Sequence, residues 1–450
     1  MATKLQHDAG NEVLAMNATH SNPARPSADL LLRGGRLIDP ANKVDAIGDV
    51  AILNGRVLAA GAAAQGFTAR REIDARGAIV CPGFIDMHVH VYEWVTNFGV
   101  PADAAGIHSG ATTIVDQGSS GAWTFGGFKA FIADRAQTDV RAFVSINVAG
   151  ALQGGMEGTT LHNPAMVDCD SLYRIAQEHP HLVRGIKCHW ESGSLSHWGP
   201  EVLKKAAEAG RTAGLPLYVH TGELFPVDEA NRPTPSAVMA QVVPHLKAGD
   251  VLAHIYSSMP DGIMSVGEDV PDWLFDAKAK GVLFDLGHGI NFSFRIARKM
   301  MDRGILPDSI GSDVHGDFTS NHDFSILDYS LVGGLNKLIG LGMSLNDCIR
   351  ALTATPSKVL NDPSIGHLGA GARANVTVLR QLEGDWSFVD CRGERLAVRE
   401  RLLPDIVVMD GDVITPDCGL LSDVMSPQER PRGITRSLHL GNGYMKVAAQ

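Results

Sequence analysis

The chain has 450 residues, enough for two or three domains or for one large barrel with an attachment. Its hydrophobic fraction of 44% and charged fraction of 20% are typical of a soluble globular protein. The formal net charge of −11, without any basic cluster, argues against a nucleic-acid partner. The six cysteines form no CxxC pair, so we expect neither a disulfide framework nor a thiolate zinc site.

The first 28 residues are polar and contain Pro23 and Pro26, which predicts a mobile N-terminal tail. They lack the apolar core of a signal peptide, and no uncharged stretch approaches the roughly 20 residues that a membrane span requires. We therefore expect a cytoplasmic protein with no membrane association. Residues 426–450 are expected to form a second tail.

Residues 29–80 contain short apolar runs separated by Gly, Asn and Pro, a pattern typical of small antiparallel strands and hairpins. The same pattern returns in residues 365–425, for example in GARANVTVLR and LLPDIVVMDGDVI. We predict that these two segments are the halves of one small β-sandwich domain.

Between them, residues 81–364 alternate apolar runs with helix-like segments. The runs are FIDMHVH and residues 112–117, 141–150, 183–190, 215–223, 250–258, 281–289 and 308–316. Eight alternating βα units predict an α/β fold, a (β/α)8 TIM barrel flanked by the β-sandwich. Among the helices, residues 200–214 carry an apolar stripe that ends at Gly214, and residues 343–360 begin after a possible N-cap at Ser344.

The first predicted barrel strand ends in PGFIDMHVH, residues 82–90. Alternation along a strand places His88 and His90 on one face and Met87 and Val89 on the other. Two converging imidazoles suit a divalent metal, although an HxH also arises by chance among 18 histidines.

Other predicted strands also end in side chains that bind metals, at the end of the barrel where catalytic groups lie. Lys187 lies near the end of the fourth strand, His220 ends the fifth, His254 the sixth and Asp313 the eighth. Each has a structural explanation by itself: a hydrogen-bonded histidine, a lysine that reaches solvent, an aspartate that shapes a turn. Their joint occurrence at the ends of the correct strands favours a metal site.

Several motifs of the chain are specific as a set: PGFIDMHVHVYE, SGATTIVDQGS, GIK, GHGINFSF and MSLNDCIRALTATPSKVL. From about Leu30 to about Leu379 the chain resembles the amidohydrolase superfamily, metal-dependent hydrolases with a barrel and a flanking β-sandwich. Within it, the motifs are similar to those of a bacterial deacetylase-like, or dihydroorotase-like, branch.

The resemblance implies a site with two divalent ions, usually zinc. His88, His90 and Asp313 would hold one ion, and His220 and His254 the other. Lys187, carboxylated by carbon dioxide, would bridge them. A hydroxide between the two ions would attack a carbonyl group, with Asp313 as the proton shuttle to the leaving group.

Four further residues are candidates for substrate binding. His189 shares a strand face with Lys187, and Tyr92 lies in the first barrel loop. His288 ends the seventh strand, where a structural histidine in a glycine-rich turn is a nearly equal alternative. The fourth is Glu223. His315 and Asp317, in the eighth loop, are further candidates for contact with a ligand.

The resulting hypothesis is a binuclear metal-dependent hydrolase of a small-molecule amide or ester: an N-acyl amino acid, an acetylated hydroxy acid or a cyclic amide. Resemblance to the superfamily also leads us to expect a homo-oligomer. One alternative is a mononuclear zinc deaminase of an aminated ring, because HTGE at residues 220–223 resembles the HxGE of purine deaminases, although these have no need of the lysine in GIK. Another alternative is a catalytically silent scaffold, which should lack some of the six ligand-type residues.

Overall fold

The computed structural model describes residues 27–152, 160–264, 269–289, 291–316 and 329–417. The expected tail over residues 1–28 therefore lies outside the described residues, except for Ser27 and Ala28, which already belong to the first strand. The expected tail over residues 426–450 and the loop residue Asp317 also lie outside them.

The N- and C-terminal segments share one eight-stranded sheet, in the order β15-β14-β13-β5-β1-β2-β3, with β4 paired to β1. Its strands are β1 (Ser27–Asp39), β2 (Val44–Leu53), β3 (Arg56–Gly61), β4 (Thr68–Asp74), β5 (Ile79–Pro82), β13 (Val376–Val389), β14 (Arg395–Met409) and β15 (Asp412–Ile414). The two segments join where β13 runs antiparallel to β5, with Val378 opposite Val80. Valines and leucines from both segments fill a common core and give this part of the chain its β-sandwich character.

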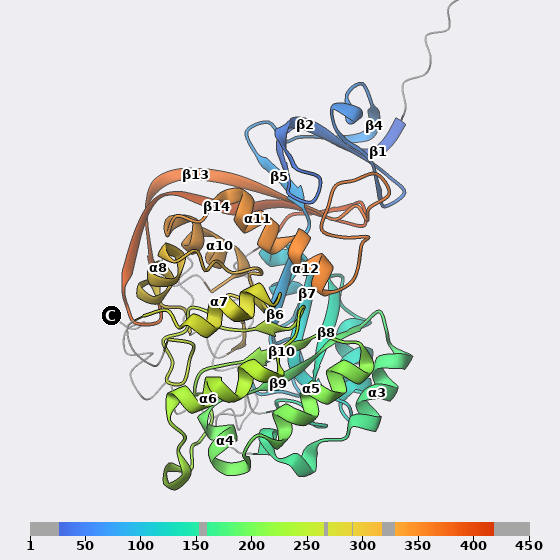
Figure 1. The fold of residues 1–450 in the computed structure, drawn as a ribbon. Helices are drawn as coiled ribbons and strands as arrows, with labels where there is room; N and C mark the ends of the chain where they lie inside the picture. The colour runs from blue at the N-terminus through green and yellow to red at the C-terminus, as the bar shows by residue number, and fades with distance from the viewer. Residues whose placement is uncertain (1–26, 153–159, 265–268, 290, 317–328, 418–450) are drawn as a thin grey trace, which may run out of the picture.

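Strands β13 and β14 are longer than a small sandwich requires. They extend from the N-terminal strands to the side of the helices α8 (Phe294–Asp302) and α10 (Leu331–Gly340), as Figure 1 shows. The Asp390 carboxylate accepts a hydrogen bond from the Phe294 amide of α8, and the Asn336 side-chain oxygen of α10 accepts one from Leu402 of β14. The hairpin thus ties the sandwich to the helical layer.

The second sheet has seven parallel strands in the order β12-β11-β10-β9-β8-β7-β6. They are β6 (Phe84–Val89), β7 (Ala111–Gly121), β8 (Asp139–Ser145), β9 (Val183–His189), β10 (Leu217–His220), β11 (Val251–Leu252) and β12 (Leu283–Phe284). Seven of the eight predicted barrel strands are therefore present. Because consecutive strands are neighbours and parallel, their carboxyl ends all lie at one edge.

The predicted eighth strand, residues 308–316, is only partly right. Here the structure has two isolated parallel bridges, Ser309 with Asp285 and Val314 with Val89, and no continuous strand. The φ angle of +54° at Asp313 is incompatible with extended backbone, which interrupts the pairing. The architecture is a curved parallel sheet with a β-sandwich beside it.

The predicted alternation of faces along β6 also fails in part. Met87 belongs to a small buried cluster with Val115 and Phe143, whereas Val89 belongs to the large core cluster of the chain. The pairing of β6 with β7 shifts register between Asp86 and Val89, so a bulge breaks the strict two-residue period.

Helices cover the parallel sheet. Besides α8 and α10, the α-helices in the described ranges are α1 (Ala102–Ala105), α2 (Phe125–Phe128), α3 (Cys169–Glu178), α4 (Ser192–Trp198), α5 (Glu201–Ala213), α6 (Pro235–Val242), α7 (Asp272–Ala279), α11 (Leu345–Leu352) and α12 (Ala354–Val359). The prediction for residues 200–214 is confirmed: α5 ends at Gly214, whose φ is +66°. Ser344 caps α11 as predicted, but the segment 343–360 divides at Thr353 into two helices.

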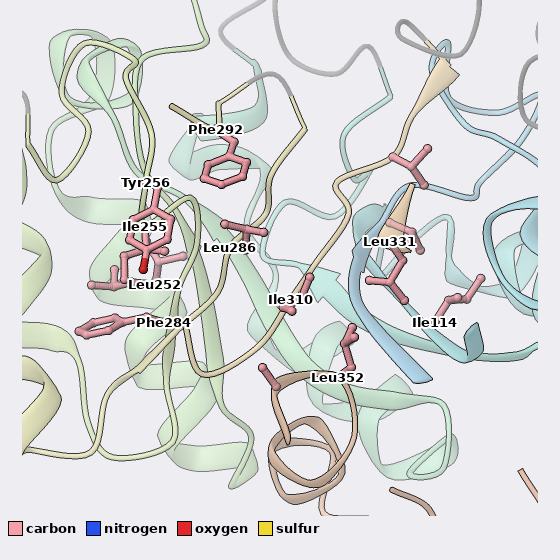
Figure 2. Close-up of a cluster of buried hydrophobic side chains, with 14 of the residues drawn as sticks. Ile114, Leu252, Ile255, Tyr256, Phe284, Leu286, Phe292, Ile310, Leu331 and Leu352 are labelled. Atoms are coloured by element: carbon pink, nitrogen blue, oxygen red, sulfur yellow. The ribbon is translucent and has the colours of Figure 1, made fainter. Parts of the chain in front are cut away.

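The main apolar core lies between sheet and helices. Figure 2 shows Ile310 among Leu286, Leu331 and Leu352, so the segment after α8 is anchored by apolar contacts although it forms no regular strand. None of the helices in the described ranges combines the length and apolarity that crossing a membrane would require.

Candidate metal centre

Three side chains from the first and last barrel segments meet at one point. His88 Nε2 lies 3.1 Å and His90 Nε2 3.5 Å from Asp313 Oδ1. The ligand atoms of the three residues all lie within 4.8 Å of one another, and all three side chains are buried. Ligands about 2.0–2.1 Å from a tetrahedral zinc ion would be about 3.3 Å apart. The observed spacing fits such an ion.

A second pair lies beside this group. His220 ends β10 and His254 follows β11 by two residues, and His254 Nε2 is 2.8 Å from His220 Nδ1. The rings of His88 and His254 are 5.3 Å apart between centroids, and His254 Nδ1 is 4.0 Å from Asp313 Oδ2. The structure thus brings together all five ligand candidates other than Lys187.

The carbonyl contacts of this pair favour one tautomer of each ring. His254 Nδ1 lies 2.7 Å from the Gly287 carbonyl and His220 Nε2 lies 3.0 Å from the Gly222 carbonyl. In the tautomers that satisfy both carbonyl oxygens, these two nitrogens donate and the nitrogens that face each other carry lone pairs. The contact of His254 Nδ1 with Gly287 is shorter than its 3.2 Å contact with the Asn291 amide nitrogen. Burial lowers the pKa of His254 to about 4 and that of His220 well below its ordinary value, so near neutral pH both rings are uncharged. Two lone pairs at 2.8 Å repel unless a cation lies between or beside them.

His88 is oriented in a comparable way. The Tyr218 hydroxyl donates to Asp285 Oδ2 at 2.6 Å and lies 3.0 Å from His88 Nδ1, so it accepts the proton of that nitrogen. Asp285 also accepts the Ser309 hydroxyl at 2.5 Å. This leaves the Nε2 lone pair of His88 facing the Asp313 carboxylate. A metal ion bound to both acceptors would remove the repulsion between them.

Removal of the Tyr218 hydroxyl tests this arrangement. Tyr218→Phe keeps the ring but leaves His88 Nδ1 and Asp285 without their common partner. We expect metal affinity to fall about 10- to 100-fold, the usual cost of losing a partner that orients a ligand. Competition for zinc with a chromogenic chelator measures the change. Wild-type affinity would show that the hydroxyl does not orient His88.

Lys187 lies in β9 and is completely buried. Its Nζ is 3.4 Å from His88 Nε2 and 4.6 Å from the centre of the Tyr218 ring. Burial lowers the pKa of Lys187 to about 8, an effect that nearby carboxylates such as Asp313 only partly oppose. Gly118 makes room for the side chain, since a Cβ there would lie 2.7 Å from Lys187 Cγ.

The backbone near the centre is strained. His254 and Asp313 have φ angles of +59° and +54°, in the left-handed region that side-chain-bearing residues rarely adopt. Gly289 admits Asp313, because a Cβ there would lie 2.6 Å from Oδ2. Strain held by the surrounding structure at two ligand candidates is typical of a functional site.

A small cavity opens onto the centre. It is lined by His88, His90, Phe98, Ala151, His189, His220, Leu224, Asn291, Asp313 and His315. Of the four substrate-side candidates, only His189 lies on this wall, with its ring 5.0 Å from that of His220.

The other three candidates are engaged elsewhere. The Tyr92 hydroxyl donates to the Thr124 carbonyl, and its ring packs on Phe128. His288 Nε2 lies 2.9 Å from the Ser330 carbonyl. Glu223 forms an ion pair with Arg232.

Sequence reasoning missed Phe98, Ala151, Leu224 and Asn291 on the wall, and Tyr218 and Asp285 behind His88. Tyr218 could have been found, because it precedes His220 by two residues and so shares its strand face. The other residues lie in loops or at strand ends, where no periodic pattern marks them.

No family model matches the chain. A deacetylase of Agrobacterium fabrum is 27% identical over 362 residues, which cover 80% of this chain and 85% of the relative. The crystal structure of an adenine deaminase matches with a TM-score of 0.76 and 25% identity, over 86% of this chain and 100% of that one. The crystal structure of a dihydroorotase matches with a TM-score of 0.74 and 25% identity, over 86% of this chain and 99% of that one.

The likenesses, the curved parallel sheet and the cluster of metal-type side chains at its edge together define a metal-dependent hydrolase. These likenesses support a member of the amidohydrolase superfamily, in the branch that contains deacetylases and dihydroorotases. The resemblance predicted from the sequence motifs is confirmed.

Proposed function

We propose that the protein is a binuclear hydrolase that cleaves an amide or ester bond of a small acyl compound. The observation that carries the proposal is the set of facing acceptors: His220 Nδ1 against His254 Nε2 at 2.8 Å, and His88 Nε2 against Asp313 Oδ1 at 3.1 Å. Each pair would hold one cation. Zinc is the expected metal, because neutral imidazoles and one carboxylate are ligands that it prefers.

Lys187 is proposed to bridge the two ions as a carbamate. An amine adds to carbon dioxide only when it is unprotonated. With its pKa lowered to about 8 by burial, roughly a tenth of the amine is neutral at pH 7, far more than for an exposed lysine. The position of Nζ 3.4 Å from His88 Nε2 places the amine beside the centre.

The side chains would divide the work. The bound ions would supply an activated water and polarise the substrate carbonyl. The carbonyl groups of Gly222 and Gly287 and the Tyr218 hydroxyl orient the histidine rings, which would hold the ions. Asp313 is the one carboxylate among the described residues that line the cavity, so it is the group placed to accept a proton and return it to the leaving group.

The deaminase alternative is less well supported. It requires Glu223 to reach the substrate ring, but this carboxylate pairs with Arg232 and does not line the cavity. The scaffold alternative predicts missing ligand-type residues, and all six are present.

The remaining expectations complete the proposal. The two bridges of Ser309 and Val314 support a closed (β/α)8 barrel over residues 81–364, with the β-sandwich formed by residues 29–80 and 365–425. We also propose that the protein forms a homo-oligomer and binds neither nucleic acid nor membranes.

Metal removal tests the proposed function. The protein is dialysed against a chelator and assayed for acid release from N-acetyl amides, acetyl esters and cyclic amides before and after zinc is restored. We expect loss of at least about 99% of the activity on removal and its recovery with zinc. Activity that survives complete metal removal would contradict the proposal.

A further inference from the structure

Part of the cavity wall is apolar. Phe98, Ala151 and Leu224 line the cavity, and Leu161 and Phe225 back them in a cluster separate from the main core. The Phe98 ring lies 4.9 Å, between centroids, from the His90 ring, in an edge-to-face arrangement. The apolar wall therefore adjoins the metal centre, so a group held against it lies close to the reacting carbonyl.

The remaining wall outside the ligand candidates is polar. It consists of the imidazoles of His189 and His315 and the amide of Asn291. Phe225 packs edge-to-face on the ring of His189 at 5.4 Å and holds it beside the cavity. These groups offer hydrogen bonds without a fixed positive charge.

No lysine or arginine lines the cavity among the described residues. The internal segments outside the described ranges, residues 153–159, 265–268, 290 and 317–328, contain no lysine or arginine in their sequence either. Two of these segments follow the wall residues Ala151 and His315 closely in the chain. The usual partner of a substrate carboxylate is therefore missing from these parts of the chain.

This lining selects by charge. An ionised carboxylate that loses its water against the apolar wall, away from the proposed ions, has no lysine or arginine in the described lining to pair with and is disfavoured. An uncharged apolar substituent gains from the same wall, because its surface leaves water. The two effects act in the same direction.

We infer that the substrate is an uncharged acyl compound with an apolar substituent beside the scissile bond, rather than one with a free carboxylate there. This inference rests on the proposed function. Within the classes expected from the sequence, it favours neutral amides, esters and cyclic amides over N-acyl amino acids and acetylated hydroxy acids.

Three probes of matched size or charge test the inference: N-acetylphenylalaninamide, N-acetylphenylalanine and N-acetylglycinamide, with both enantiomers of the phenylalanine compounds. Acetate release by the zinc-loaded enzyme gives kcat/KM for each. We expect the phenylalanine amide to exceed the acid at least about 10-fold in kcat/KM, because only the acid places a carboxylate beside a lining that supplies no lysine or arginine. It should also exceed the glycine amide at least about 10-fold.

A wall variant separates the apolar contribution. Leu224→Ala should reduce the preference for the phenylalanine amide over the glycine amide at least about threefold. Leu345→Ala in α11, a partly buried leucine that does not line the cavity, is the matched control and should leave the preference unchanged.

The outcomes are distinguishable. Equal or faster hydrolysis of the acid would overturn the inference and leave the proposed function standing, as would an unchanged preference in Leu224→Ala. No acetate from any of the three probes at full metal content would overturn the inference. If acetyl esters and cyclic amides also gave no product, the proposed function would be overturned with it.

Discussion

Asp313→Asn should retain the fold and most of the bound metal, while kcat falls about 10³-fold for every substrate. The amide has the size of the carboxylate and still offers an oxygen, but it cannot take up a proton at neutral pH. The backbone at this position is already adapted to a side chain in the left-handed region, a conformation that asparagine tolerates. Single-turnover kinetics together with elemental analysis measure the two effects on the same sample.

Glu223→Gln is the matched control for this variant. It also converts a carboxylate near the site into an amide, but Glu223 pairs with Arg232 away from the cavity wall. We expect its activity to stay within about threefold of wild type, since an ion pair that is partly open to solvent and off the cavity wall contributes little. Comparable losses in both variants would support the deaminase hypothesis, and an active Asp313→Asn enzyme would remove Asp313 from the proton path.

Lys187→Met should reduce the bound metal from about two ions per chain to one or fewer and abolish turnover. Methionine fills a similar volume but cannot form a carbamate. Elemental analysis of protein purified with bicarbonate measures the loss. A variant that holds two ions and retains wild-type activity would contradict the bridging role.

The same variant has a pH signature in the metal-free protein. The pKa of buried Lys187, about 8, lies below its ordinary value of 10.5, so the unfolded chain binds this proton more readily. The resulting destabilisation is complete below pH 8 and disappears as the pH rises towards 10.5. Wild type should therefore gain about 1–3 kcal/mol over this range relative to Lys187→Met. Thermal melts of both metal-free proteins at several pH values measure the difference. An equal pH dependence of stability in the two proteins would show that the amine is not buried.

The sequence predicted the elements whose side chains repeat regularly. Apolar runs identified seven parallel strands, and Gly214 and Ser344 marked helix ends, because these signals are local. Polar residues directly after apolar runs identified the five side chains that meet beside Lys187, since the carboxyl ends of parallel strands share one edge.

What the sequence could not predict depends on contacts between distant residues. The bulge that separates Met87 from Val89 and the left-handed backbone at Asp313 are set by packing, so period counting gave the wrong face for Met87 and a continuous eighth strand. HTGE places Glu223 near His220 in the chain, but the Glu223 carboxylate pairs with Arg232 and does not line the cavity. The wall residue Phe98 lies in a loop, where no pattern identifies it.

The most direct test of the central claim is anomalous X-ray diffraction at the zinc absorption edge, on crystals grown with zinc and bicarbonate. We predict two anomalous peaks about 3.5 to 4 Å apart, one among His88, His90 and Asp313 and the other beside His220 and His254, with added electron density on Lys187 Nζ. A single peak with an unmodified Lys187, or no peak at these side chains, would contradict a binuclear centre.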